Sequence, residues 1–471
     1  MTRLSTDVSA DDRTTYNILP GSSQRGTDKL FDSNGYTYSV VRTNCDGSRL
    51  WRCTVRGKNA CRATVKQRDG GYAKGLRDHN HGGKVGAYEA ALVAVETAKR
   101  AMAQPFKSAA RIAEEVVQEQ YPEGRPLHGL QKIEYLARNA NNARCRTRPL
   151  EPRTTNFTLS VTDIPENFVV GDIQTQSARH ILFATERQMA LLRNVKTWYV
   201  DATFEVVREP FSQLFSIHGF VRSGEATKQV PLLYCVMSRR RRKDYVAVFS
   251  KVMELVGDAR VKRLLTDFEQ AVWRAVTAVM PNVELKGCSF HYAQAVFRKI
   301  TSLGLKRYYK RRNTAHLLMR QLMCLCYLPS ASIEPVFNRL RRKNSDRKLD
   351  ELFQYMHTTW IENSVWSTNN LSVYGTAIRT NNDLEGWHNR LNKYGKRKMP
   401  FYMLVDLIHG EAEFAEGQVQ VISEGKVMRR RRRQSVESDK KLYELWQDFK
   451  DGKKTAKRLL KDIALSKLLA H

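Results

Sequence analysis

The pattern of hydrophobic and polar positions divides the N-terminal third of the chain into three parts. Residues 1–27 are polar and rich in Ser, Thr and Asp, which predicts a polar tail. Residues 31–81 alternate apolar and polar positions, with β-branched residues and Asn-Gly and Asp-Gly turn signals, and this predicts short strands. Residues 86–150 repeat apolar positions at helical spacing, and proline-containing breaks separate three predicted helices.

Further along, the pattern becomes that of an α/β domain. The segments TWYVDATF, QLFSIHGFV and VPLLYCVMS predict three successive strands, which a helix, a strand, a second helix and a strand follow. A mostly helical stretch comes next, and one more helix is predicted from Asn381 to Lys393. The sequence therefore predicts an α/β domain over residues 196–425 with a helical insertion at about 292–378.

Composition changes this picture chiefly through charge. The 471-residue chain has 79 Lys and Arg against 48 Asp and Glu, a formal net charge of +31. A charge of this size attracts polyanions, so nucleic acid is the expected partner. Hydrophobic residues make up 42% of the chain, which excludes wholesale disorder. No run of about 18 apolar residues occurs, so we expect no membrane partner.

Two runs of arginine concentrate the positive charge. The first follows the third predicted strand of the α/β domain, and the second lies in residues 426–471, a predicted basic C-terminal tail. Each run is a candidate site for DNA phosphates or a nuclear-import signal, with a solvated turn as the alternative. We therefore expect the protein in the nucleus. The candidate DNA-binding residues are Arg239, Arg240, Arg241, Arg242, Arg429, Arg430, Arg431, Arg432 and Arg433.

Cysteine and histidine residues form a spaced series among the first predicted strands. Cys53, Cys61, His79 and His81 follow one another as C-x7-C-x17-H-x-H. Four such donors can converge tetrahedrally on zinc, and a small β-rich unit needs such a cross-link because it buries little core. The alternative is two chance thiols beside a histidine-rich loop. Cys45 lies outside the series and is predicted to be a hydrophobic or turn thiol.

Aromatic residues around this series carry a resemblance to a known family. Phe31, Tyr38 and Trp51, with the Cys and His series and its HNH ending, resemble a FLYWCH-type zinc finger over residues 28–85. The resemblance implies that those four residues hold Zn²⁺ and that the finger binds DNA or protein rather than catalysing a reaction. For residues 86–150, a helix-turn-helix-like DNA-binding region and a plain spacer bundle both remain open.

Two aspartates stand at the ends of apolar strands. Asp201 lies in TWYVDATF, and Asp267 lies in VKRLLTDFEQA. Carboxylates at the ends of buried strands are costly unless a cation lies beside them, and two or three of them can hold divalent metal ions for phosphoryl transfer. The alternative for each Asp is the N-cap of a following helix. Glu269, close to Asp267, is predicted to be a solvated or supporting group.

A second resemblance rests on short blocks in the α/β region. DATFEVV, QLFSIHGF, VPLLY, TDFEQAV, GCSFHYAQA and TNNDLEGWHN are similar, in this order, to segments of the Mutator-like element (MULE) transposase domain. The resemblance implies a ribonuclease-H-like fold and an Asp-Asp-Glu catalytic triad that binds Mg²⁺ or Mn²⁺. Carried over residue by residue, the triad falls on Asp201, Asp267 and Glu385, with the helical insertion before Glu385.

Other polar residues accompany the implied triad. Cys288 and His291 form a C-x2-H pair that the family also shares, and a supporting role, a DNA contact and metal binding all remain open for them. His388 follows Glu385 by about one helical turn, so the predicted helix places both on one face, where His388 supports the site or contacts DNA. Asp383 is predicted to cap that helix.

Together the two resemblances predict a DNA transposase. The finger and the helical region would recognise terminal repeats, while the α/β domain would cut a strand at each end and join the free 3′-hydroxyl to target DNA. Double-stranded DNA and further copies of this chain, as a homo-oligomer, are the expected partners. A domesticated, catalytically inactive DNA-binding regulator is the alternative, and a ribonuclease acting on RNA–DNA hybrids is a third interpretation.

Overall fold

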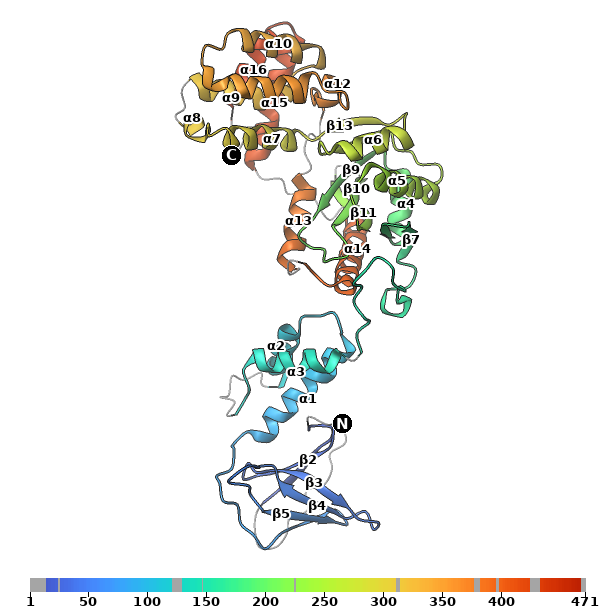
Figure 1. Ribbon diagram of the computed structural model, residues 1–471, viewed down its shortest axis with the longest axis vertical. Helices are drawn as coiled ribbons and strands as arrows, with labels where there is room; N and C mark the ends of the chain where they lie inside the picture. The colour runs from blue at the N-terminus through green and yellow to red at the C-terminus, as the bar shows by residue number, and fades with distance from the viewer. Residues whose placement is uncertain are drawn as a thin grey trace. The chain divides into compact units, whose positions relative to one another are not determined.

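A computed structural model divides the chain into two compact units, Met1–Leu150 and Glu151–His471. Figure 1 colours the first unit from blue to green-blue and the second from there to red. The predictions for residues 1–13 and for Arg429 to Arg432 lie outside the described residues, as does the side chain of Arg433. The described residues are 14–23, 26–120, 129–145, 147–223, 226–310, 314–376, 382–394, 398–423 and 433–466.

The first unit begins with a six-stranded antiparallel sheet whose strands pair in chain order. Leu30, Trp51 and Val65 are fully buried in its core because alternate side chains point to one face. Gly47, at φ 77°, permits the tight Asp-Gly turn between the third and fourth strands. The strands are β1 (Tyr16–Leu19), β2 (Lys29–Asp32), β3 (Thr37–Thr43), β4 (Arg49–Cys53), β5 (Thr64–Arg68) and β6 (Gly71–Lys74).

Strand β1 lies within residues 1–27, which the sequence predicted to be a polar tail. Its four residues pair with β2, and Leu19 is buried. The described end of that segment is therefore part of the sheet. The polar composition hid this strand because a short edge strand needs only one or two apolar side chains on its inner face.

Three helices follow, as the sequence predicted: α1 (Ala87–Ala103), α2 (Ala109–Gln120) and α3 (Ile133–Arg144). Their apolar stripes form one core, which includes Val93, Ile112 and Leu136. Residues 121–128, between α2 and α3, lie outside the described residues, so the helix-turn-helix-like region and the spacer bundle both stay predictions.

The second unit contains a seven-stranded sheet in the order β13-β12-β9-β10-β11-β8-β7. Strand β10 is antiparallel to both of its neighbours, β9 and β11, while β12 runs parallel to β9 and β13 parallel to β12. The strands and helices follow the predicted order. They are β9 (Thr197–Thr203), β10 (Gln213–Ser223), β11 (Ala226–Met237), α5 (Arg242–Val256), β12 (Arg263–Thr266), α6 (Gln270–Val279) and β13 (Glu284–Gly287).

The sheet is extended by two strands that the sequence interpretation did not include. Strand β8 (Arg179–Phe183) pairs with β11, and β7 (Val169–Gln174) pairs with β8, before helix α4 (Glu186–Asn194) leads into β9. All five side chains of β8 are buried. The α/β unit therefore begins before residue 196, where the predicted domain starts.

Helices cover both faces of the sheet. Phe215 of β10 packs against α5, and on the opposite face Tyr234 of β11 stacks on Trp387 of α13. Helix α13 (Asn382–Tyr394) and the long α14 (Phe401–Ser423) thus lie across the sheet from α5. The site described below lies on the α13 side.

The remaining helices pack together beyond β13, where the sequence predicted an insertion. The first of them begins at Ser289, slightly before the predicted start. They are α7 (Ser289–Ser302), α8 (Lys306–Lys310), α9 (Thr314–Met323), α10 (Ser330–Arg342), α11 (Asp350–Met356) and α12 (Thr368–Leu371), with 3₁₀ turns at Leu325–Tyr327 and Arg347–Leu349 and a π-helical turn at His357–Ile361. No described helix is long and apolar enough to span a membrane.

Residues 433–466 belong to this helical part, although the sequence interpretation described 426–471 as a tail. They form α15 (Arg433–Lys450) and α16 (Ala456–Leu465), which lie beside α9 and α10 in Figure 1. The indole of Trp446 donates to the carbonyl of Tyr327 at 3.0 Å. Leu459, Leu460 and Ile463 are fully buried, so apolar burial anchors this segment.

Candidate functional site

The four predicted zinc ligands lie together beside the first sheet. Cys53 ends β4, Cys61 precedes β5, and both histidines follow β6. Their ligand atoms all lie within 4.8 Å of one another. Cys53 Sγ is 3.2 Å from His81 Nε2, and Cys61 Sγ is 3.3 Å from His79 Nδ1. Two thiolates and two imidazoles at these separations fit a single tetrahedral Zn²⁺.

Hydrogen bonds behind the ligands determine which nitrogen of each histidine faces the centre. His79 Nε2 donates to the Tyr38 hydroxyl at 2.8 Å, and that hydroxyl donates to Asp32 Oδ2 at 2.7 Å. His81 Nδ1 donates to the carbonyl of Gly82 at 2.9 Å. Burial lowers the pKa of His79, so its ring is neutral. Each ring therefore keeps a lone pair for the metal on the nitrogen that faces the thiols.

Loss of the Tyr38 hydroxyl should weaken zinc binding although every ligand remains. Tyr38→Phe keeps the ring in the core but deprives His79 and Asp32 of their shared partner. We expect the dissociation constant for Zn²⁺ to rise about 10- to 100-fold, as measured by competition with a chelator. Tyr72→Phe, whose ring stacks on Tyr16 in the same sheet, is the control. Equal affinities for the two variants would contradict this role of Tyr38.

The second unit brings the two predicted catalytic aspartates to one edge of its sheet. Strands β9 and β12 are parallel, and Tyr199 pairs with Leu265. Continued by two residues, this register sets Asp201 beside Asp267, on strands about 4.8 Å apart. Asp201 is only 9% exposed. The register thus brings the backbones of the two aspartates close together at one edge of the sheet, although the residues are far apart in sequence.

Neither aspartate is the N-cap residue of a helix, which was the alternative explanation for both. Strand β9 leads to β10 without a helix between them, and the N-cap residue of α6 is Glu269. Asp267 Oδ1 accepts the backbone N–H of Glu269 at 3.1 Å, and Asp201 Oδ1 accepts that of Ala202 at 2.9 Å. These contacts orient the two carboxylates.

Two neutral histidines lie against these aspartates. His388 Nδ1 of α13 is 3.8 Å from Asp201 Oδ2, and His291 of α7 lines a pocket with Asp267. Burial, followed by the nearby His291, lowers the pKa of His388 to about 4, and burial lowers that of His291. His388 Nε2 and His291 Nδ1 are buried and lack a hydrogen-bond partner among the described residues. Such atoms are typical of a site that water or a ligand completes.

Helix α13, which includes Glu385, lies against the same edge of the sheet. Glu385 lies one turn before His388, so the two positions share a helix face. Leu384 packs in an apolar cluster with residues of β9 and β12. The side chains of Glu385 and Asp383 lie outside the described part. Within the described side chains, the group in the finger is the only convergent set of three or more metal-ligating residues.

A carboxylate on α14 anchors α13, and no sequence pattern pointed to it. Glu411 accepts the indole N–H of Trp387 at 2.9 Å and pairs with the guanidinium of Arg390. The Trp387 ring in turn packs on Tyr234 and His218 of the sheet. Glu411 therefore fixes the position of α13, and with it the position of His388.

Loss of the Glu411 charge should disturb, from a distance, the site that the sequence predicts for Mg²⁺. Glu411→Gln loses the ion pair with Arg390, so α13 is held less firmly. We expect an approximately 10-fold or greater loss of cleavage rate, together with a higher Mg²⁺ requirement. Mg²⁺ titrations of the rate at a temperature well below unfolding test this. Glu413→Gln, on the exposed side of the same helix, should match wild type; an unchanged Mg²⁺ requirement in Glu411→Gln would exclude the role.

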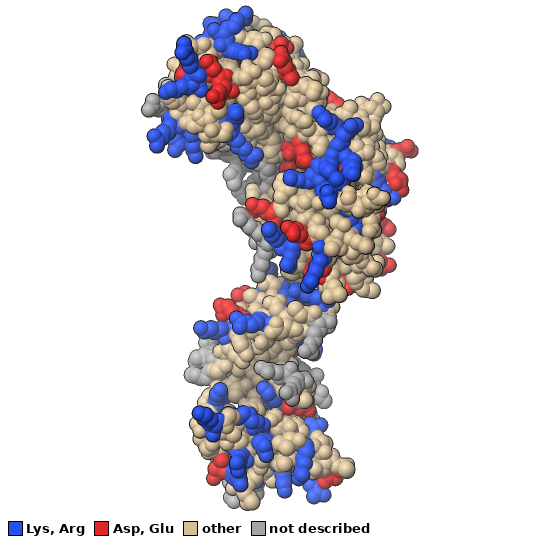
Figure 2. Space-filling model, viewed as in Figure 1, with Lys and Arg blue, Asp and Glu red and all other residues tan. Residues whose placement is uncertain are grey.

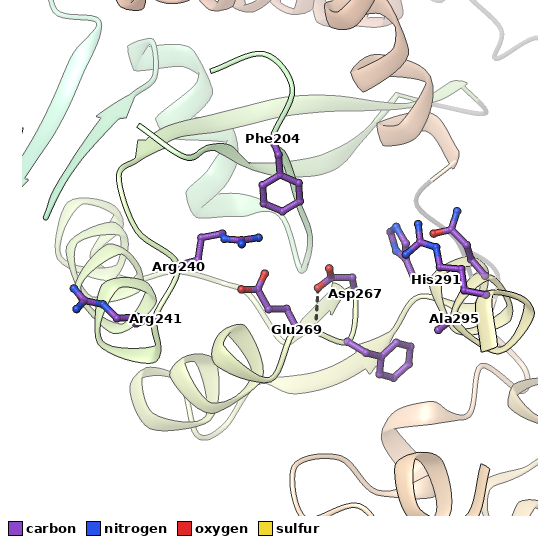
Figure 3. A pocket seen from close by; sticks show the side chains of 10 residues that line it. Phe204, Arg240, Arg241, Asp267, Glu269, His291 and Ala295 are labelled. Carbon is purple, nitrogen blue, oxygen red and sulfur yellow. Dashed lines mark hydrogen bonds between the residues drawn. The ribbon is translucent and has the colours of Figure 1, made fainter. Parts of the chain in front are cut away.

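An open pocket of about 680 Å³ lies beside Asp267. Figure 3 shows the carboxylates of Asp267 and Glu269 next to Arg240, with the other lining side chains around them. Burial and the neighbouring Asp267 raise the pKa of Glu269. Three arginines, Arg240, Arg241 and Arg298, line the pocket against these two acids. Its cationic wall suits a phosphate ester.

The first arginine run lies partly in this pocket. Arg240 and Arg241 line it, while Arg239 and Arg242 are exposed at the start of α5.

The two members of the C-x2-H pair have different surroundings. Cys288 is fully buried in the apolar cluster below α13, whereas His291 faces the pocket.

Comparisons with known families agree with both resemblances. Residues 21–81 match the family model of the FLYWCH zinc finger domain, and residues 197–295 match that of the MULE transposase domain. The chain therefore carries a FLYWCH zinc finger followed by a MULE transposase domain, and these domains support a transposase-like or DNA-binding role. The second match includes Asp201 and Asp267 and ends before Glu385. A comparison with curated proteins gives no match.

Proposed function

We propose that the protein is a DNA transposase of the Mutator-like class. It cuts a DNA strand at each terminal inverted repeat and transfers the free 3′ end to target DNA. The observation that carries the proposal is the convergence of Asp201, Asp267 and helix α13 at one edge of the sheet. The MULE domain over residues 197–295 supports it.

The strand order supports a ribonuclease-H-like fold for this domain. Three antiparallel strands, β9 to β11, come first, and β12 then pairs with β9 rather than with β11. After β11, the chain crosses back through α5 and adds β12 on the free side of β9. The ends of β9 and β12 thereby become neighbours. This topology is what makes one site from two aspartates that are far apart in sequence.

Asp201, Asp267 and Glu385 are the residues that would hold Mg²⁺ or Mn²⁺. Carboxylate oxygens are the ligands that these ions prefer. When bound, such ions activate the attacking water or 3′-hydroxyl and stabilise the leaving oxygen. His388 and His291, both neutral, would hydrogen-bond water or phosphate oxygens at the edge of the site through their unpaired nitrogens.

Cationic side chains would hold the DNA. Arg240 and Arg298 line the pocket beside Asp267, where they would contact the phosphates that flank the cleaved bond, while the guanidinium of Arg241 pairs with Asp244. Figure 2 shows lysine and arginine in separate patches along the visible surface, with fewer acidic side chains. The FLYWCH finger and helices α1 to α3 would recognise the terminal repeats. Because two ends must be joined, we propose a homo-oligomer that acts in the nucleus.

Cleavage of a terminal-repeat duplex tests this function. The substrate carries the inverted repeats that flank the reading frame, and a scrambled repeat is the control. We expect full-length protein to nick the first substrate in Mg²⁺ or Mn²⁺ and to stop when EDTA is added. Tight, sequence-specific binding without any nick in either metal would favour the inactive regulator instead.

A further inference from the structure

Phe204 is a large apolar side chain that lies uncovered beside the proposed catalytic centre. It follows the last residue of β9 and lies three positions after Asp201. Its ring is 47% exposed, whereas Val206 and Phe211, further along the same segment, are buried. A single exposed ring needs no explanation on a protein surface. This ring, however, lines the pocket that also contains Asp267.

The Phe204 ring is held in a stack with an arginine. The guanidinium carbon of Arg240 lies 4.7 Å from the ring centroid. In Figure 3 the Arg240 side chain reaches between Phe204 and Glu269, and all three lie at the pocket. Aromatic rings and guanidinium planes are the surfaces on which unpaired nucleobases stack. The stack therefore presents a flat binding surface that is already in place before DNA arrives.

The rest of the pocket has a different chemistry. Arg298 adds positive charge, which suits phosphate oxygens but does not explain an exposed phenyl ring. A nucleotide combines both requirements, since it has an anionic phosphate and a flat, largely apolar base. A base inside the double helix has neighbours on both faces, so only a base that has left the stack can lie on Phe204.

We propose that Phe204 and Arg240 form a binding site for one unpaired nucleobase next to the phosphodiester at Asp201 and Asp267. This inference rests on the proposed function, because it takes DNA as the ligand of the pocket. Stacking on Phe204 offsets part of the cost of opening the base pair. The site therefore favours DNA that is unpaired beside the cleaved bond over fully paired DNA.

Binding measurements on two DNA substrates test the proposal. The full-length protein is titrated in Ca²⁺ against a paired duplex and against a forked duplex with 2-aminopurine at the first unpaired position. We expect wild type to bind the forked duplex about 10-fold more tightly and to quench the 2-aminopurine fluorescence. Phe204→Ala should lose the preference and the quenching but keep its affinity for the paired duplex. Phe204→Trp should retain both.

Phe414 provides a matched control. Its ring is 52% exposed and lies under Arg390, with 5.3 Å from the guanidinium carbon to the ring centroid, but it does not line the pocket. Phe414→Ala removes an equally exposed ring from an equivalent stack. It should therefore keep the preference for forked DNA at the wild-type value.

Two results would overturn the base-binding site: a wild-type protein without preference for the forked duplex, or a Phe204→Ala variant that keeps this preference. Cleavage in Mg²⁺ is a separate measurement on the same proteins. A wild-type protein that prefers forked DNA through Phe204 but never cuts would contradict the transposase proposal and support the base site. A protein that cuts DNA while Phe204→Ala keeps the preference would contradict the base site alone.

Discussion

Asp201→Asn and Asp267→Asn are each expected to abolish Mg²⁺-dependent DNA cleavage, with a rate loss of about 1,000-fold or more. Asparagine keeps the size of each side chain and the oxygen that accepts a backbone N–H. It removes the negative charge that a divalent cation requires. DNA binding should persist, since cationic side chains provide it. Single-turnover nicking rates and gel-shift affinities, measured on the same preparations, separate the two effects.

The assignment of Glu385 as the third catalytic carboxylate can be tested against two neighbouring acidic residues. Glu385→Gln should abolish cleavage like the two aspartate variants, whereas Asp383→Asn and Glu362→Gln should retain most of it. The side chain of Glu362 is 67% exposed. Its Oε1 lies 3.3 Å from Nε2 of His357, so its ion-pair partner is this histidine. If Glu385→Gln still cuts DNA while Asp383→Asn or Glu362→Gln does not, the triad has been assigned wrongly.

Cys53→Ser should remove zinc and unfold the finger. Zinc in a small structural site contributes about 10 kcal/mol of apparent binding free energy, which is folding free energy when the apo form is unstable. The finger core around Trp51 and Val65 is small, so it cannot replace that contribution. We expect native mass spectrometry to find one Zn²⁺ in wild type and none in the variant. Hydrogen exchange across residues 29–74 should rise to unprotected values.

Cys45→Ser is the matched control for this experiment. Cys45 is an exposed free thiol in the turn between β3 and β4, outside the ligand group. The variant should keep its zinc and its protected amides. A Cys53→Ser protein that still holds one Zn²⁺, or that keeps a protected sheet without it, would contradict the zinc site.

The sequence predicted the central fold because its signals are local. The strands β9 to β13 are apolar runs with turn residues on either side, and their order could be predicted directly. Strand β7 (Val169–Gln174) is half exposed, and β8 is held by pairing with β11, which lies far along the chain. Helix α16 has apolar residues at helical spacing, but the surface that buries them comes from α9 and α10. Such long-range partners leave no periodic signal.

The site residues also differ in whether their signal is local in the sequence or depends on distant partners. The zinc ligands lie within 30 residues of one another, so their spacing alone indicated a site. Asp201 and Asp267 could be paired because Asp201 lies near the end of one apolar strand and Asp267 directly follows another. Glu411 acts only through the packing of α14 against α13, which nothing near it in the sequence reveals. Phe204 stands beside Asp201 in DATF, but its exposure and its stack with Arg240 depend on the folded pocket.

Iron-directed cleavage of the polypeptide tests most directly whether Asp201, Asp267 and Glu385 surround one metal site. Fe²⁺ binds oxygen ligands in place of Mg²⁺, and with ascorbate and peroxide it produces hydroxyl radicals that cut the backbone nearby. In full-length protein, we predict fragments that end close to all three residues and that disappear with excess Mg²⁺ or in Asp267→Asn. Cuts that miss one of these segments, or that persist in excess Mg²⁺, would contradict the site.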